Sequence, residues 1–183
     1  MSDLKLVGLC GSLRRESTNL MLLKEAGRVF GASDFVIGDI DFPLYNEDVE
    51  NGDGIPEKVQ TLSEQIAAAD AVILSTPEYN KGTSGAMKNA LDWISRTEGN
   101  PWRDKPVALM SAAAGRAGGE RAQNMARLCL NPFRPRLLTG PEVMLAQSRK
   151  QFDEDGRLTD ERALKLLTEQ MQELRREVER MRG

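Results

Sequence analysis

Hydroxyl and basic side chains are concentrated in one short segment near the start of the chain, which reads GSLRRESTN over residues 11–19. Because a stretch with helical spacing follows, free backbone N–H groups and the positive end of a helix dipole would favour an anion there. Ser12 and Ser17 can donate hydrogen bonds and Arg14 can neutralise charge, which predicts a phosphate site. The same residues also fit a plain polar loop in which Ser17 or Thr18 caps the helix.

A second segment of unusual composition, TPEYNKGTSG over residues 76–85, follows a strongly apolar run. Backbone N–H and C=O groups in such a loop can bond the edge of a heterocycle, while Pro77 and Tyr79 border the face of the ring. The pattern therefore predicts a surface for a flat cofactor. A simple connector, with Ser84 as the cap of the next helix, is the alternative.

Residue types that side-chain catalysis usually requires are scarce. The chain has no histidine, which removes His-dependent triads, His-ligated zinc and the commonest general base. Cys10 and Cys129 lie far apart and outside any Cys-x-x-Cys spacing, so both are interpreted as ordinary buried thiols and no metal site is expected. We therefore expect no catalytic side chain and assign the chemistry to a cofactor.

Strand and helix patterns alternate around these segments. Apolar runs predict strands over Leu4–Leu9, Asp34–Ile40, Ala71–Ser75, Val107–Met110 and Glu142–Leu145. Spacings of three and four residues predict helices from Ser17 or Thr18 to Phe30, over Pro56–Ala69, around Met87–Ile94, over Gly119–Leu130, and from Asp160 onward.

This alternation predicts an α/β fold of the flavodoxin-like kind, a three-layer doubly wound sheet of five parallel strands in the order 2-1-3-4-5. Ligands of such sheets bind at the carboxyl ends of the strands, near the point where the strand order reverses. The loops after the first, third and fourth strands are therefore expected to meet in one site. The last of these loops is the glycine-rich segment 111–119.

Bulk properties limit the function classes. With 183 residues, 40% of them hydrophobic, a single domain over residues 1–183 is expected. The net charge is -3 and the basic residues are scattered, so the sequence carries no footprint for nucleic acid. The first residues, Met1–Leu9, lack a basic leader, and no apolar run approaches the roughly 20 residues of a membrane span. A cytoplasmic protein without membrane insertion is expected.

Several motifs occur together and in collinear order. They are Gly11-Ser12-Leu13-Arg14 with Ser17 and Asn19, the segment Asp41–Glu50, Pro77-Glu78-Tyr79-Asn80, and Lys88-Asn89-Ala90-Leu91-Asp92-Trp93. In this combination the chain resembles the NADPH-dependent FMN reductases, which include bacterial quinone and chromate reductases. The match extends from the first strand to Gly119, and the combination is more specific than any single motif.

The resemblance implies two groups of FMN-binding residues. The phosphate would be held by Ser12, Arg14, Ser17, Asn19 and the backbone of Leu20. The isoalloxazine ring would be surrounded by Pro77, Glu78, Tyr79 and Asn80, largely through backbone atoms, and its other edge by the loop that contains Ser111 and Gly115. The chain departs from the family at Ala112 and Ala113, where relatives often carry hydroxyl residues, so backbone contacts must serve at those positions.

The implied activity is electron transfer from NADPH or NADH, through bound FMN, to quinones or other oxidised acceptors such as chromate, ferric complexes, azo compounds or free flavin. Lys81 and Arg116 lie on loops near the expected ring, where they could attract an anion or be solvated surface charges. A flavodoxin-type electron carrier is the second hypothesis, but Arg14 and the mild net charge speak against it. A flavin- or nucleotide-dependent sensor without turnover is the third.

The predicted C-terminal helix carries a stripe of apolar residues that could mediate assembly. These residues follow steps of three and four: Leu164, Leu167, Met171, Leu174, Val178 and Met181. A coiled coil needs a longer stripe, so we interpret this helix as the cover of one face of the sheet. By resemblance we expect a homodimer or homotetramer. Trp93, Trp102 and the segment 131–134 are candidate interface residues, with ordinary core or surface packing as the alternative.

Overall fold

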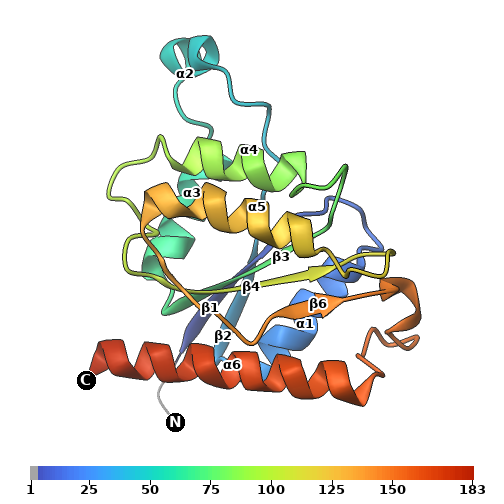
Figure 1. The fold of residues 1–183 in the computed structure, drawn as a ribbon. Coiled ribbons are helices and arrows are strands. Elements are labelled where there is room, and N and C mark those ends of the chain that lie inside the picture. Colours follow the sequence, from blue (N-terminus) through green and yellow to red (C-terminus); the bar gives the residue numbers. More distant parts are fainter. Residues whose placement is uncertain (1–3) are drawn as a thin grey trace.

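The computed structural model describes residues 4–183, and each predicted strand and helix is present, with ends that shift by a few residues (Figure 1). The strands are β1 (Lys5–Cys10), β2 (Asp34–Gly38), β3 (Ala71–Thr76), β4 (Pro106–Ala112), β5 (Arg136–Leu137) and β6 (Val143–Leu145). The helices are α1 (Thr18–Phe30), α2 (Glu47–Asp53), α3 (Glu57–Ala68), α4 (Gly85–Ile94), α5 (Glu120–Leu130) and α6 (Glu161–Arg182), with short 3-10 helices η1 (Asn131–Phe133) and η2 (Ser148–Lys150). Residues 1–3, which belong to the segment Met1–Leu9 that is predicted to lack a basic leader, lie outside the described residues.

The sheet has the predicted topology. Its strands follow the order β2-β1-β3-β4-β5, and every pair is parallel. β3 and β4 are buried along their whole length, because helices cover both faces of the sheet. The reversal of strand order falls between β1 and β3, so the loops that follow these strands diverge to opposite faces and leave a crevice between them.

The sheet has one strand more than the five predicted, because the edge position next to β4 is occupied by two short strands, of which β6 is the predicted fifth strand. β5 pairs with the start of β4, and β6 pairs with its end. Pro141 lies between them and has no backbone N–H to donate to a ladder. Buried glutamines bond the carbonyl groups around this break instead: Gln170 donates to the carbonyl of Pro141 at 2.8 Å, and Gln123 donates to that of Val143 at 2.8 Å.

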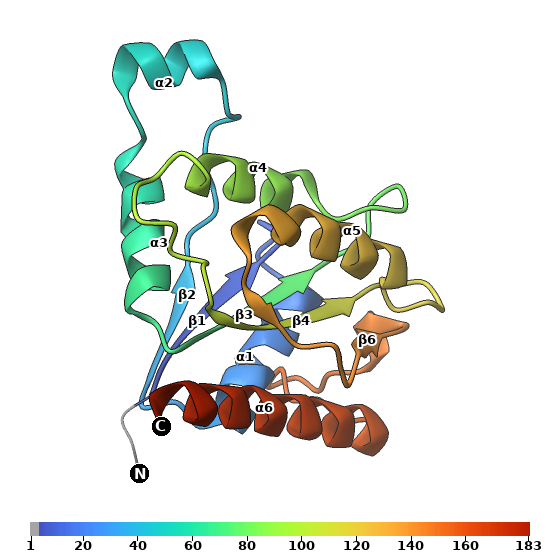
Figure 2. The same cartoon turned by 60° about the vertical axis from the view of Figure 1, so that its left-hand side comes forward.

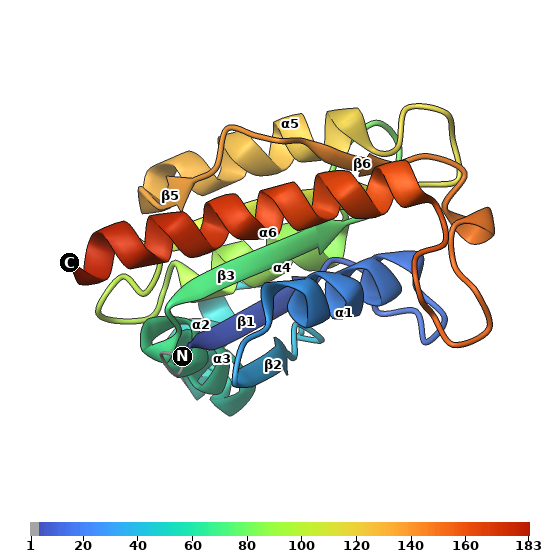
Figure 3. The ribbon, with the colours of Figure 1, turned by 90° about the horizontal axis from the view of Figure 1, so that it is seen from below.

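Side chains of the central strands alternate between two apolar cores. Figures 1 and 3 show α1 and α6 on one face of the sheet and α3, α4 and α5 on the other. On β4, Ala108, Met110 and Ala112 enter the core beneath α1 and α6, whereas Val107 and Leu109 enter the core beneath α4 and α5. This alternation decides which residues at the strand ends can reach the crevice.

Helix α6 lies on the sheet and closes the core on the α1 side. The apolar stripe of α6 is buried from Leu167 to Val178, and only its last member, Met181, is largely exposed. This burial confirms the prediction that the helix covers one face of the sheet and does not form a coiled coil. Trp93 and Trp102 are fully buried in the opposite core, so ordinary core packing, and not an interface, accounts for both. Among residues 4–183, no helix combines the length and the apolar character that crossing a membrane requires.

Helix α2 is an element that the sequence pattern does not predict. It stands away from the sheet in Figures 1 and 2, and none of its residues is buried. Asn46 caps it by accepting a hydrogen bond from the N–H of Asp48 at 2.9 Å. The segment before it is anchored to α4, because Trp93 Nε1 and Asn89 Nδ2 both donate to the carbonyl of Pro43, at 2.8 and 2.9 Å.

Candidate flavin-phosphate site

A cavity of about 310 Å³ lies at the carboxyl ends of β1, β3 and β4, where the sheet topology predicts a ligand. Its lining comes from four separate segments that the fold brings together: Ser12, Arg14, Ser17, Thr18 and Asn19; Pro77, Glu78 and Tyr79; Ala112, Ala113 and Ala114; and Ser148 and Arg149. Seven of the predicted site residues therefore line one cavity, namely Ser12, Arg14, Ser17, Asn19, Pro77, Glu78 and Tyr79.

One end of the cavity is the first turn of α1. Ser17 is the N-cap in extended conformation, and its Oγ accepts a hydrogen bond from the N–H of Leu20 at 3.4 Å. Ser17 therefore caps the helix, as one of the two predictions for this loop states. The cap engages the N–H of Leu20, which the family resemblance implies as a contact of the phosphate. The remaining first-turn N–H groups have no partner within the helix and are suited to an anion.

Asn19 has a structural role in addition to its place in the lining. Its Oδ1 accepts from Ser75 Oγ at 3.0 Å and from the N–H of Ala112 at 2.9 Å, and its Nδ2 donates to the carbonyl of Ala112 at 2.8 Å. The side chain is almost wholly buried, with 3% exposed. It therefore ties the start of α1 to the ends of β3 and β4 and fixes the shape of the cavity.

Positive charge at this end comes from Arg14 and Arg149. Both side chains are exposed, and within residues 4–183 neither makes an ion pair or a side-chain hydrogen bond. The 3-10 helix η2 that carries Arg149 is joined to α1 because Thr18 Oγ1 donates to Ser148 Oγ at 3.0 Å. Two cations without protein partners beside a helix N-terminus are suited to an anion.

The other end of the cavity is formed by the loop after β3. Tyr79 and Gly82 exchange two backbone hydrogen bonds of 3.0 Å, and the residues between them, Asn80 and Lys81, both have positive φ, which defines a tight turn. The carboxylate of Glu78 accepts from the N–H of Arg121 at 3.1 Å, in the first turn of α5. Pro77 and Tyr79 are thereby held at the cavity, whereas Asn80 is exposed in the turn and does not line it.

The third wall is the end of β4 together with the two residues that follow it. Ala112, Ala113 and Ala114 line it, but Ser111 does not, because side chains alternate along a strand and Ser111 lies on the α5 side of the sheet. Ser111 Oγ donates to the carbonyl of Gly118 at 2.7 Å and accepts from Gln123 Nε2 at 2.9 Å. Gly115 also lies outside the lining, with its carbonyl bonded to the N–H of Gln147 at 3.3 Å.

Sequence reasoning missed Thr18 as a lining residue, and it missed the segment that contains Ser148 and Arg149. A signal was available for that segment: a serine and two basic residues follow the last strand at the same edge of the sheet. Lys81 and Arg116, by contrast, are exposed and do not line the cavity.

The two thiols differ in environment. Cys10 is buried beneath the cavity, where its Sγ donates to the carbonyl of Ser12 at 3.4 Å. Burial raises the pKa of the Cys10 thiol, which keeps it protonated and unreactive at neutral pH. Cys129 is only partly buried, whereas the prediction was a buried thiol.

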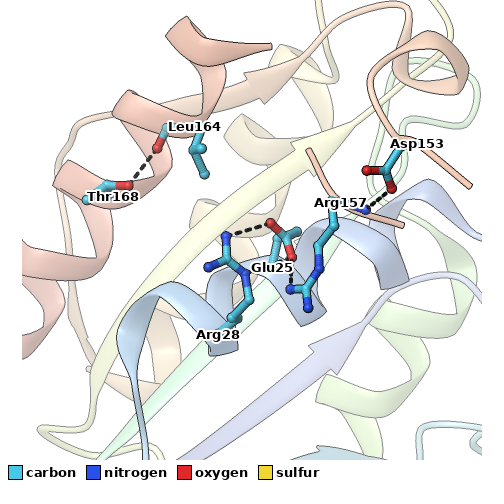
Figure 4. A network of polar contacts seen from close by, with 6 residues as sticks. All are labelled: Glu25, Arg28, Asp153, Arg157, Leu164 and Thr168. Atoms are coloured by element: carbon cyan, nitrogen blue, oxygen red, sulfur yellow. Dashed lines mark hydrogen bonds and ion pairs between the residues drawn. The ribbon is translucent and has the colours of Figure 1, made fainter. Parts of the chain in front are cut away.

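Glu25 carries the single carboxylate of α1, and 3% of its side chain is exposed. Its oxygens accept from Arg28 Nη2 at 2.9 Å and from Arg157 Nη1 at 2.9 Å, as Figure 4 shows. Burial by itself would raise the pKa of Glu25, but the hydrogen bonds and charges of the two arginines lower the pKa below its ordinary value. The ion pair with Arg157 fixes the segment after η2 to α1.

The family of the chain follows from comparison with known proteins. Residues 4–150 match the family model described as NADPH-dependent FMN reductase. The chain belongs to this family. It is 44% identical over 183 residues to an NAD(P)H-dependent FMN reductase of Pseudomonas aeruginosa, covering 99% of this chain and 98% of the relative. It is 36% identical over 172 residues to a quinone reductase of Escherichia coli, covering 92% of each chain.

A solved structure agrees with this assignment. The flavoenzyme FerB of Paracoccus denitrificans, an NAD(P)H:(acceptor) oxidoreductase, superimposes with a TM-score of 0.86 at 31% identity and covers 97% of this chain and 98% of its own. The predicted membership of the NADPH-dependent FMN reductases, the flavodoxin-like fold, and the assignment of FMN with NADPH or NADH as cofactors are therefore confirmed.

The donor set of the cavity fits the family cofactor. A phosphate needs N–H groups, hydroxyls and positive charge, which are present at Ser12, Ser17, Arg14 and the first turn of α1. A flat heterocycle needs apolar faces and backbone groups at its edge. Pro77 and Tyr79 supply the faces, and the backbone of Ala114 supplies edge groups, because the N–H groups of Ala112 and Ala113 already donate to Asn19 and Leu145. The alanines at 112 and 113 leave the third wall without side-chain hydrogen-bonding groups at those positions, as the departure from the family pattern predicts.

Proposed function

We propose that the chain is a reductase that holds FMN in this cavity and passes electrons from NADPH or NADH to a small oxidised acceptor. Quinones are the acceptor class we favour, with chromate, ferric complexes, azo compounds and free flavin as further candidates. One observation carries the proposal: residues suited to an anion and residues suited to a flat ring line a single cavity at the reversal of strand order. When bound, FMN supplies the two-electron chemistry between nicotinamide and acceptor.

In this proposal the residues of the chain act by binding and orientation. Ser12, Ser17, Arg14 and the first turn of α1 bind the phosphate, with Asn19 positioning the turn. Pro77 and Tyr79 border the ring, and the exposed side of Tyr79, 57% of its surface, leaves room for a second ring to approach.

No side chain of the cavity is required as a nucleophile or proton carrier. The Cys10 thiol is buried and protonated, and the Glu78 carboxylate already accepts a hydrogen bond from α5. The lining therefore contributes position and exclusion of water, and the rate is expected to depend on how nicotinamide and acceptor are presented to the flavin.

The test is steady-state oxidation of NADPH and of NADH by the FMN-loaded protein, with and without a benzoquinone. Multiple turnovers that require both FMN and the quinone would support the proposal. Binding of FMN without nicotinamide oxidation would instead favour an electron carrier or a sensor.

We further propose that residues 1–183 form one domain, that the enzyme acts in the cytoplasm, and that it assembles as a homodimer or homotetramer. The single sheet with one core on each face supports the first statement. Light scattering of the purified protein tests the third, since a monomeric mass would contradict it.

A further inference from the structure

A second pocket, of about 540 Å³, opens next to the anion end of the cavity. It is lined by Arg14, Glu16, Thr18, Met21, Arg149, Phe152 and Asp153. It shares Arg14, Thr18 and Arg149 with the first cavity, and it shares none of the ring-side residues 77–79. The two hollows therefore meet at the place proposed for the FMN phosphate.

One wall of this second pocket is a tight hairpin. Phe152 and Leu158 form an antiparallel bridge, and Asp153 Oδ1 accepts from the N–H groups of Asp155 and Arg157 at 3.0 and 2.8 Å. Figure 4 shows Arg157 reaching from this hairpin to Glu25 of α1. Because Glu25 is buried, this ion pair fixes the hairpin against α1 and gives the pocket a defined shape.

The chemistry of the lining differs along the pocket. The unpaired Arg14 and Arg149 suit a second phosphate next to the first. Met21 and Phe152, both half-buried, supply an apolar surface and an aromatic ring on which a flat base can stack. The carboxylates of Glu16 and Asp153 are acceptors for hydroxyl groups, the same chemistry by which acidic residues hold a ribose in other nucleotide sites.

We propose that this second pocket binds the adenylate half of FAD, so that the chain accepts FAD as well as FMN. The inference rests on the proposed function, because it requires the FMN phosphate to lie at Arg14 and Ser17. The second phosphate then contacts Arg149, the ribose faces Glu16 and Asp153, and the adenine packs on Phe152 and Met21. FMN alone leaves this pocket unused.

The test compares the two flavins on the 183-residue chain freed of flavin. FMN and FAD are titrated by fluorescence quenching, and the bound flavin is identified by chromatography to exclude hydrolysis of FAD. We expect the dissociation constant of FAD to lie within ten-fold of that of FMN. If FMN binds and FAD binds more than ten-fold more weakly, the inference is wrong while the proposed function stands. If neither flavin binds, the proposed function itself fails.

Variants of Phe152 test whether the adenine contacts this ring. Phe152→Ala is expected to raise the ratio of the FAD to the FMN dissociation constant at least five-fold. Phe133→Ala removes a half-buried ring from η1, remote from the pocket lining, and should leave the ratio unchanged. Should Phe152→Ala fail to fold, Phe152→Leu keeps apolar contact with the core but removes the flat ring, and the ratio should still rise. An unchanged ratio in a folded Phe152 variant would place the adenylate elsewhere and overturn the inference.

Discussion

Replacement of Arg14 by alanine should weaken FMN binding without disturbing the fold. Arg14 is exposed and makes no ion pair within residues 4–183, so the change breaks no contact inside the protein. What is lost is a charge-assisted hydrogen bond to the phosphate, for which about 1.5–3 kcal/mol is typical. Because solvent screens an exposed charge, we expect about 1.5–2 kcal/mol, a roughly 10- to 30-fold rise in the dissociation constant.

The assay is flavin fluorescence titration of the parent, Arg14→Ala and Arg15→Ala, each with FMN and with riboflavin. Arg15 is a neighbouring exposed arginine outside the cavity lining, so its removal controls for overall charge. Of these combinations, only the affinity of Arg14→Ala for FMN should fall. The difference in FMN affinity between the parent and Arg14→Ala should become smaller at about 1 M salt, where exposed charges are screened within about 3 Å. Equal losses for the two variants, or an equal loss for riboflavin, would refute the phosphate assignment.

Three further predictions concern stability, measured by urea unfolding. Asn19→Ala should lower the free energy of unfolding by about 2–4 kcal/mol, because it leaves partners at β3 and β4 unsatisfied, and a loss below about 1 kcal/mol would contradict the role of Asn19 as a tie. Leu174→Ala should cost about 2–5 kcal/mol and Met181→Ala less than about 0.5, since only Leu174 is buried on the sheet; similar losses would argue against α6 as its cover. The lowered pKa of Glu25 stabilises the fold above the ordinary value of 4.5, and that contribution is lost as the pH falls through the folded-state pKa. Below about pH 5, the free energy of unfolding of Glu25→Gln should therefore fall less steeply with falling pH than that of the parent. Equal slopes for the two proteins in this pH range would contradict a lowered pKa of Glu25.

The sheet order and part of the lining could be predicted from local patterns in the sequence, and the family resemblance added Asn19 and Glu78. Fully apolar runs such as Ala71–Ser75 indicate buried parallel strands, and the strand order then determines which loops meet. The Ser17 cap and the Pro77–Tyr79 loop were recognised because hydroxyl, proline and aromatic residues have specific roles at such positions.

The remaining features depend on tertiary contacts. Helix α2 has no apolar face to indicate it, and its place depends on the bonds from Asn89 and Trp93 to Pro43. The two-residue β5 is too short for a periodic signal. The family resemblance implies Ser111 as a site residue, but its side chain points to the opposite face, a distinction that requires the strand register.

The central claim is that this chain binds FMN and reduces it with a nicotinamide. The most direct measurement is the visible absorption spectrum of the purified protein with FMN, recorded anaerobically before and after addition of NADPH. We predict a bound flavin whose oxidised absorption is rapidly bleached by the nicotinamide. Failure to bind FMN, or a bound flavin that stays oxidised in excess NADPH and NADH, would contradict the account.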